Sequence, residues 1–172
     1  MSSQSHNKKG FTLIETLVAI AIIMLSVAGP LVIAQKGIAS AVYARDQVIA
    51  SYLAQDVVEY VRSIRDNNLL GSQPWLTNLG ECRDKYCYID TINGAKTTVE
   101  YDSDNTTFPS LNYDGNNYTY MPGGQSTSFR RSVNIVNINT TEAVITVKMN
   151  WKTGAFPQRF IIKEHIFDVL AP

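Results

Sequence analysis

The chain has 172 residues, and its 15 Lys and Arg residues are balanced by 15 Asp and Glu residues. This length predicts a single anchored domain, and the lack of excess positive charge excludes a general electrostatic affinity for nucleic acid. Residues 35–172 carry a formal charge of −1, and these 138 residues are enough to build a hydrophobic core.

The first predicted element is an apolar helix over residues 11–34. Of these 24 residues, 18 are Ala, Val, Ile, Leu, Met or Phe. As a helix they would span roughly 36 Å, which exceeds the ~30 Å hydrocarbon core of a bilayer. Lys8 and Lys9 would hold the short N-terminus in the cytoplasm. We therefore expect a single-pass protein of the cytoplasmic membrane with its head outside.

Glu15 lies inside this apolar stretch, where a carboxylate costs roughly 2.5–3.5 kcal/mol and needs a partner. A local explanation is a capping box formed with Thr12 at the start of the helix. The alternative is a cut after Gly10, which would free the amine of Phe11 one helical turn from Glu15. That amine would pair with Glu15 of its own chain or of a neighbour, and pairing between chains would set the register of an assembly.

Two other fates of the N-terminal segment are a secretory signal cut after Ala34 and a plain uncleaved anchor. A secretory signal usually has 7–15 apolar residues. The observed stretch is longer and contains Glu15, and both features argue against that cut.

The helix pattern continues as an amphipathic half over residues 35–68, so one helix is expected from about residue 12 to residue 66. Gly29 and Pro30 predict a kink in its first half, because proline removes a backbone hydrogen bond. Arg62 and Arg65 are expected in the last turn, where cations favour the helix dipole.

Residues 69–172 predict a globular antiparallel head. A loop over 69–81, with Trp75 or Leu76 buried, leads to a hairpin of strands 86–92 and 95–101 around Asn93 and Gly94, a strong two-residue turn signal. Residues 102–127 are rich in Asp, Asn, Ser, Thr, Gly and Tyr. They predict a long exposed loop with one short strand at 118–121, which is either a solvated connector or a binding loop.

Three strands are expected to complete the head, over residues 129–138, 143–151 and 159–170. In the middle one, alternate residues are apolar (Ile145, Val147, Met149 and Trp151), which is typical of a sheet with one buried side. The expected fold is therefore α+β, with the second half of the long helix packed on a small antiparallel sheet. In an exported domain, Cys82 and Cys87 are expected to form one disulfide.

Little in the sequence points to catalysis, and we expect no enzyme activity, no cofactor and no metal site. His165 follows Glu164 on a strand, where neighbours face opposite sides. Two short acidic stretches, 102–104 and 112–116, hint at calcium ligands but lack the bidentate glutamate of a complete loop. Arg130 and Arg131 form a basic doublet, a weak basis for a contact with DNA.

Residues 8–15 are Lys-Lys-Gly-Phe-Thr-Leu-Ile-Glu. Together with the apolar stretch that follows, this string resembles the class III leader and N-methylation motif of the type IV pilin superfamily. Weaker similarity over residues 54–59, 62–66, 129–133 and 147–151 resembles minor pilins of the pilus modification (PilV-like) type.

The resemblance implies a pilin fold, removal of residues 1–10 by prepilin peptidase between Gly10 and Phe11, N-methylation of Phe11, and docking guided by Glu15. It implies other pilins as partners through the N-terminal helix, and loosening around Gly29 and Pro30 on filament packing is a further possibility. The expected function is a minor pilin or pseudopilin in a type IV pilus-like filament. The alternatives are a tip subunit that binds a surface or DNA through residues 102–127, and a type II secretion pseudopilin.

Overall fold

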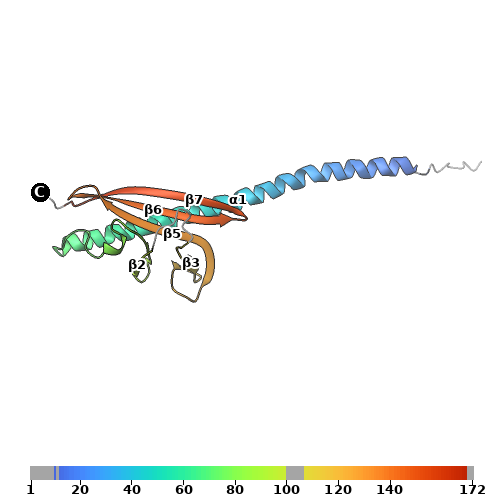
Figure 1. Cartoon of the computed structure of the whole chain (residues 1–172). Helices are drawn as coiled ribbons and strands as arrows, with labels where there is room; N and C mark the ends of the chain where they lie inside the picture. The colour runs from blue at the N-terminus through green and yellow to red at the C-terminus, as the bar shows by residue number, and fades with distance from the viewer. Residues whose placement is uncertain (1–9, 11, 100–106, 170–172) are drawn as a thin grey trace, which may run out of the picture. The chain divides into compact units, whose positions relative to one another are not determined.

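The computed structural model describes residues 10, 12–99 and 107–169, and shows a long N-terminal helix followed by a seven-stranded antiparallel sheet (Figure 1). This confirms the predicted α+β class. The elements are α1 (Leu13–Leu70), η1 (Gly80–Cys82), β1 (Tyr86–Ile89), β2 (Lys96–Thr98), β3 (Ser110–Tyr113), β4 (Tyr118–Thr119), β5 (Gln125–Asn137), β6 (Glu142–Thr153) and β7 (Phe156–Phe167). The chain divides into two compact units, Met1–Val42 and Tyr43–Pro172.

Helix α1 extends four residues beyond the predicted end at residue 66, so the placement of Arg62 and Arg65 in its last turn is wrong. The reason is Asn68, which is buried and still helical. Its Nδ2 donates to the carbonyl oxygens of Trp75 at 3.1 Å and Thr77 at 2.8 Å. The last turn of the helix thereby holds the loop that follows it, in which both Trp75 and Leu76 are buried.

The core of the second unit lies between one face of α1 and one face of the sheet. The helix contributes small and branched side chains, namely Ala50, Leu53, Ala54, Val57, Val58 and Val61. Strand β6 contributes the predicted alternate residues Ile145, Val147, Met149 and Trp151, each with at most 4% of its surface exposed. The prediction of a one-sided sheet packed on the helix is therefore confirmed.

The hairpin of β1 and β2 is present, but the prediction of a two-residue turn at Asn93 and Gly94 is wrong. Ile89 pairs with Lys96, and the N–H of Gly94 donates to the carbonyl of Asp90 at 2.8 Å. A type I′ turn needs positive φ at both central residues, and of these two only Gly94 has it, at 76°. A Cβ at Gly94 would lie 2.8 Å from Oη of Tyr60, so this glycine lets the turn approach α1.

Residues 107–127 are not the long exposed loop predicted from their composition. They contain β3 and β4, the latter inside the predicted short strand, and Phe108 and Leu111 are almost fully buried. Gly124 crosses close to β3, since a Cβ there would lie 2.5 Å from the carbonyl oxygen of Tyr113. The part of the predicted loop over residues 102–106 lies outside the described residues.

Strand β5 has three partners and organises the sheet. It pairs with β1 at Val133 and Asn134, with β3 between Gln125 and Arg130, and with β6 from Arg130 to Asn137. Strand β7 pairs with β6 over its whole length. The part of β5 that precedes Arg130 curves away from the hairpin of β6 and β7 (Figure 1).

Candidate functional site

The start of α1 is capped by Thr12. The N–H of Glu15 donates to Oγ1 of Thr12 at 3.3 Å, and the N–H of Thr16 donates to the carbonyl of Thr12 at 3.2 Å. Ser, Thr, Asp and Asn are favoured at this position because they satisfy N–H groups that lack helical partners. Glu15 lies in the first turn with an exposed side chain. Phe11, whose amine was predicted to pair with Glu15, lies outside the described residues.

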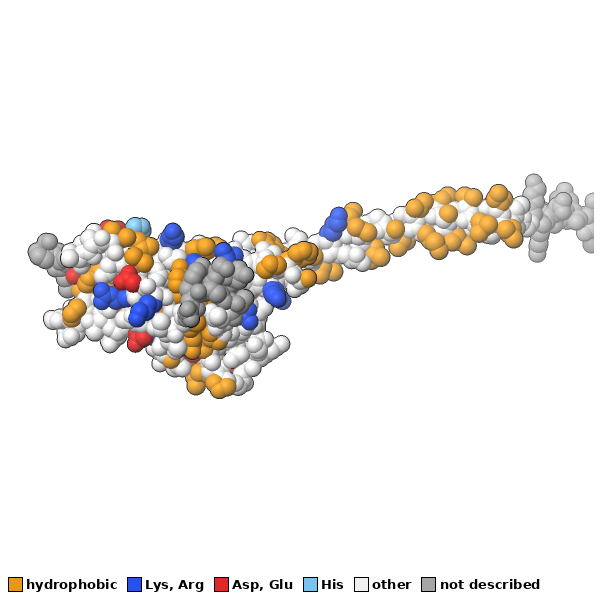
Figure 2. Space-filling view, in the orientation of Figure 1, with side chains coloured by type: hydrophobic (Ala, Val, Ile, Leu, Met, Phe, Trp, Pro, Cys, Tyr) orange, Lys and Arg blue, Asp and Glu red, His pale blue; other side chains and the backbone are white. Residues whose placement is uncertain are grey.

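The first unit presents apolar side chains to its surroundings. Leu13, Ile14, Met24 and Leu25 each expose at least 67% of their surface, and Figure 2 shows hydrophobic atoms all along this part of the helix. Helix α1 contains an apolar window of 18 residues, none of it buried, and so has the length and composition of a membrane span. The hydroxyl of Ser26 donates to the carbonyl of Ile23 at 2.8 Å, so it does not need a partner outside the helix.

Helix α1 is continuous through Gly29 and Pro30. Because Pro30 has no N–H, the carbonyl of Ser26 loses its usual helical donor at this point. This part of the helix is therefore intrinsically weaker than the turns on either side.

The comparison with protein families concerns this same segment. Residues 5–29 match the family model of the prokaryotic N-terminal methylation motif. The match includes Gly10, Phe11 and Glu15, and it supports a protein of the type IV pilin and pseudopilin superfamily. None of the curated proteins or solved structures compared with the chain matches it.

In the head, Cys82 and Cys87 are joined by a disulfide, with Cα atoms 5.0 Å apart and both side chains fully buried. The bond closes a short loop between η1 and β1. The disulfide therefore constrains the chain locally at the edge of the core.

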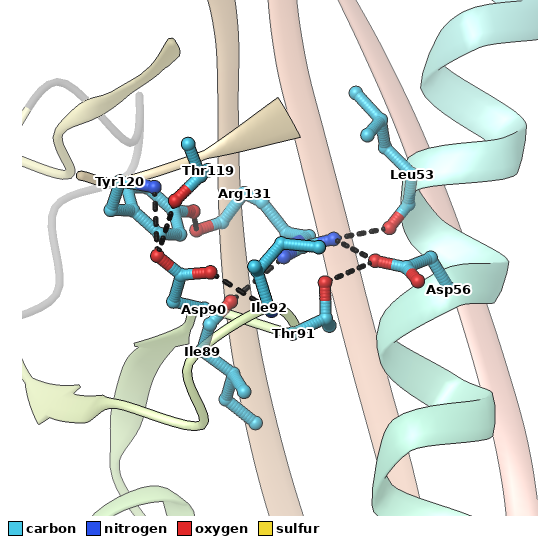
Figure 3. A network of polar contacts seen from close by, with 9 residues as sticks. All are labelled: Leu53, Asp56, Ile89, Asp90, Thr91, Ile92, Thr119, Tyr120 and Arg131. Carbon is cyan, nitrogen blue, oxygen red and sulfur yellow. Dashed lines mark hydrogen bonds and ion pairs between the residues drawn. The ribbon is translucent and has the colours of Figure 1, made fainter. Parts of the chain in front are cut away.

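An arginine that was not predicted to be buried lies at the centre of the head. Arg131 is 1% exposed and extends from β5 toward α1 (Figure 3). Its Nη1 donates to the carbonyl of Leu53 at 2.7 Å and to Oδ2 of Asp56 at 3.2 Å, and its Nη2 donates to the carbonyl of Ile89 at 2.7 Å. The guanidinium thus joins the helix to the β1–β2 hairpin, and Arg131 is not available for the contact with DNA considered from the sequence.

Asp90 continues this network on the other side of the hairpin. Its Oδ2 accepts hydrogen bonds from Oγ1 of Thr119 at 2.7 Å and from the N–H of Tyr120 at 3.0 Å (Figure 3). The hydroxyl of Tyr120 donates to the carbonyl of Arg131 at 3.2 Å, and burial raises the pKa of Tyr120 to about 12. The alternation Phe129, Arg131, Val133 is the signal that places Arg131 on the core face.

The other polar residues singled out in the sequence have structural partners. Nδ1 of His165 lies 2.7 Å from Oε1 of Glu142, while Glu164 forms an ion pair with Arg62. Oδ1 of Asp114 accepts the N–H groups of Asn117 and Asn116, which lowers the pKa of Asp114. Asn112 and Tyr113 therefore belong to β3, and residues 114–117 form a turn closed by the side chain of Asp114. Within the described ranges no three His, Cys, Asp or Glu residues gather as a metal site.

Proposed function

We propose that this protein is a minor subunit of a type IV pilus-like filament. It is made as a precursor, cut between Gly10 and Phe11 by prepilin peptidase and N-methylated at Phe11. It then waits in the cytoplasmic membrane until its N-terminal helix packs against other pilins. The main support is the methylation motif at residues 5–29, followed by an exposed apolar helix with a carboxylate in its first turn.

The proposed driving forces are apolar packing and one charge pair. Glu15 is costly in hydrocarbon without a counter-charge, and the cleaved amine of Phe11 supplies one. When the two groups belong to different subunits, both charges are neutralised only in the correct register. Gly29 and Pro30 are proposed to loosen when the helix packs into the filament. The proposal covers secretion pseudopili as well as pili, and minor status follows from the resemblance alone.

The test of assembly is Glu15→Ala in the full chain, with Glu59→Ala as the matched control on the exposed side of α1. We expect Glu15→Ala to lower incorporation into sheared filaments at least tenfold while the amount in the membrane stays unchanged. Glu59→Ala should assemble normally, because Glu59 is exposed and pairs with Arg62. Normal incorporation of the Glu15 variant would contradict the charge-pair proposal.

The test of processing is the intact mass of the protein extracted from membranes. The expected species begins at Phe11 and carries one additional methyl group. A species that begins at Gln35 would indicate a secretory signal, and one that retains Met1 would indicate an uncleaved anchor. Either result would contradict the proposed maturation.

A binding role for residues 102–127 was the alternative function. Within this segment, residues 107–124 include β3, β4 and the buried Phe108 and Leu111, so they are part of the fold rather than a free binding loop. The filament role is therefore the function proposed for the molecule.

A further inference from the structure

The separation of β5 from β6 opens a groove in the head. The β5–β6 ladder ends where Arg130 pairs with Asn150. From there β5 continues to Gln125 along β3, while β6 continues to Thr153 along β7. An open groove of about 690 Å³ lies at this divergence, and we call it the fork groove. It is lined by Ser110, Thr127, Ser128, Arg130, Asn150, Trp151, Lys152, Pro157, Gln158 and Arg159.

The register of the sheet places three cationic residues around Asn150. Arg130 on β5 and Arg159 on β7 are its direct partners on either side, so their Cα atoms are roughly 10 Å apart. Lys152 lies two residues further along β6, on the same face as Asn150. Three positive side chains from three strands thus line one groove.

The rest of the lining is suited to an anion. The described lining residues include no Asp or Glu, and Ser110 and Gln158 add a hydroxyl and an amide group. The hydroxyls of Thr127 and Ser128 donate to the carbonyls of Leu111 and Lys152. Nε of Arg130 is buried and has no hydrogen-bond acceptor among the described residues. A buried donor left without an acceptor costs roughly 1–3 kcal/mol, and a turn of the Arg130 side chain toward an oxyanion in the groove would recover this cost.

Positive charge continues beyond the groove on the same face of the sheet. Lys148 pairs with Ser132, and Lys163 pairs with Thr146, which places both lysines on the face of Arg130 and Arg159. On the described strands β5–β7, the acid on this face is Glu142 at the far end, beside His165. The face is therefore strongly basic although the whole chain has no net charge.

We propose that the fork groove binds a phosphate group, with Arg130, Lys152 and Arg159 as its ligands. The guanidinium fork matches the geometry of phosphate oxygens, and charge-assisted hydrogen bonds are stronger than neutral ones. The phosphate is either the free ion or part of a phosphodiester chain that also passes over Lys148 and Lys163. This site is independent of the proposed role in filament assembly.

The first experiment titrates inorganic phosphate into the ¹⁵N-labelled full chain in non-ionic detergent. Saturable shifts of the Nε–H resonances of Arg130 and Arg159 are expected. Arg159→Gln should weaken binding about tenfold, and Lys152→Gln serves as a second variant whose exposed side chain leaves folding intact. Lys85→Gln removes one exposed positive charge outside the groove, and its affinity should stay within about twofold of the unsubstituted chain.

The proposal is overturned if phosphate causes no saturable shift, or if the Lys85 and Arg159 variants bind it equally well. A twelve-nucleotide oligothymidylate then identifies the source. Tighter binding than inorganic phosphate, with a salt slope that falls by about 0.7 in Lys163→Gln, supports a phosphodiester chain. Equal binding supports the free ion, and unchanged oligonucleotide binding in Arg159→Gln overturns the site.

Discussion

At the scale of single residues, Arg131 shows how a charge can be part of a hydrophobic core. Its guanidinium satisfies two carbonyl groups, those of Leu53 and Ile89, that belong to different elements. Its carboxylate partner Asp56 keeps about half of its side-chain surface in solvent. The buried charge is thus compensated mainly by backbone oxygens.

Arg131→Met should lower the free energy of unfolding by about 3 kcal/mol, because it leaves two buried carbonyls without donors. Urea unfolding of the full chain in detergent, followed by the fluorescence of Trp75 and Trp151, measures this loss. Arg130→Met is the control, since the neighbouring side chain lies on the other face of β5, and it should cost less than about 1 kcal/mol. Equal losses of unfolding free energy in the two variants would show that the burial of Arg131 does not determine its contribution to stability.

Tyr120 links the same network to alkaline pH. Its pKa is raised by burial to about 12 from the ordinary value of 10. The folded state therefore holds the phenolic proton more tightly than the unfolded state. The resulting stability is complete below pH 10 and is lost as pH rises through 12, a total of roughly 2–3 kcal/mol.

Tyr120→Phe should be about 1 kcal/mol less stable than the unsubstituted chain at pH 8, because it loses the hydrogen bond to the carbonyl of Arg131. The two free energies of unfolding should become equal at about pH 11, and the phenylalanine variant should be the more stable one at pH 11.5, since it lacks this titration. Urea unfolding at pH 8 and pH 11.5 measures the difference. A difference that stays constant with pH would mean that Tyr120 does not cause the loss of stability at alkaline pH.

At the scale of elements, the turn between β1 and β2 is shaped by its contact with α1. Gly94 has positive φ and little room beside Tyr60, whereas Gly115 has positive φ, at 106°, and open space around its Cα. Substitutions at these two glycines therefore distinguish the cost of backbone strain from the cost of a steric contact.

Gly115→Ala should cost about 1 kcal/mol from backbone strain alone. Gly94→Ala should cost at least about 1 kcal/mol more, since its Cβ overlaps the hydroxyl of Tyr60. Adding Tyr60→Phe to Gly94→Ala should recover part of the extra loss, which a double-mutant cycle by urea unfolding measures. If Tyr60→Phe recovers no stability, the cost of Gly94→Ala comes from backbone strain in the turn and not from the contact with Tyr60.

The elements that the sequence predicted well are those whose pattern is local and long. The helix and the last three strands have clear apolar periodicity, and β6 shows the alternation of Ile145, Val147 and Met149. Strand β3 escaped prediction because four polar-rich residues with one buried Leu111 carry almost no period. The burial of Arg131 was not predicted because Arg130 and Arg131 form a basic doublet in the sequence, which conceals the alternation of Phe129, Arg131 and Val133.

At the scale of the whole molecule, the two units depend on different surroundings. The second unit buries its own core, with the described cluster extending from Ala50 to Ile166. The first unit keeps its apolar side chains exposed, so lipid or other helices must cover them. The sequence predicted this first unit from composition alone. It did not predict the fork groove, which depends on pairing between distant strands.

The arrangement of the core determines when its apolar residues can be covered during synthesis. The apolar stripe formed by Ala50, Val57 and Val61 leaves the ribosome early, but the strands that cover it lie near the C-terminal end. Contacts so distant in sequence form late and slowly. The stripe therefore stays unshielded until β6 and β7 have left the ribosome, so a nascent chain is most vulnerable to aggregation and proteolysis just before synthesis finishes.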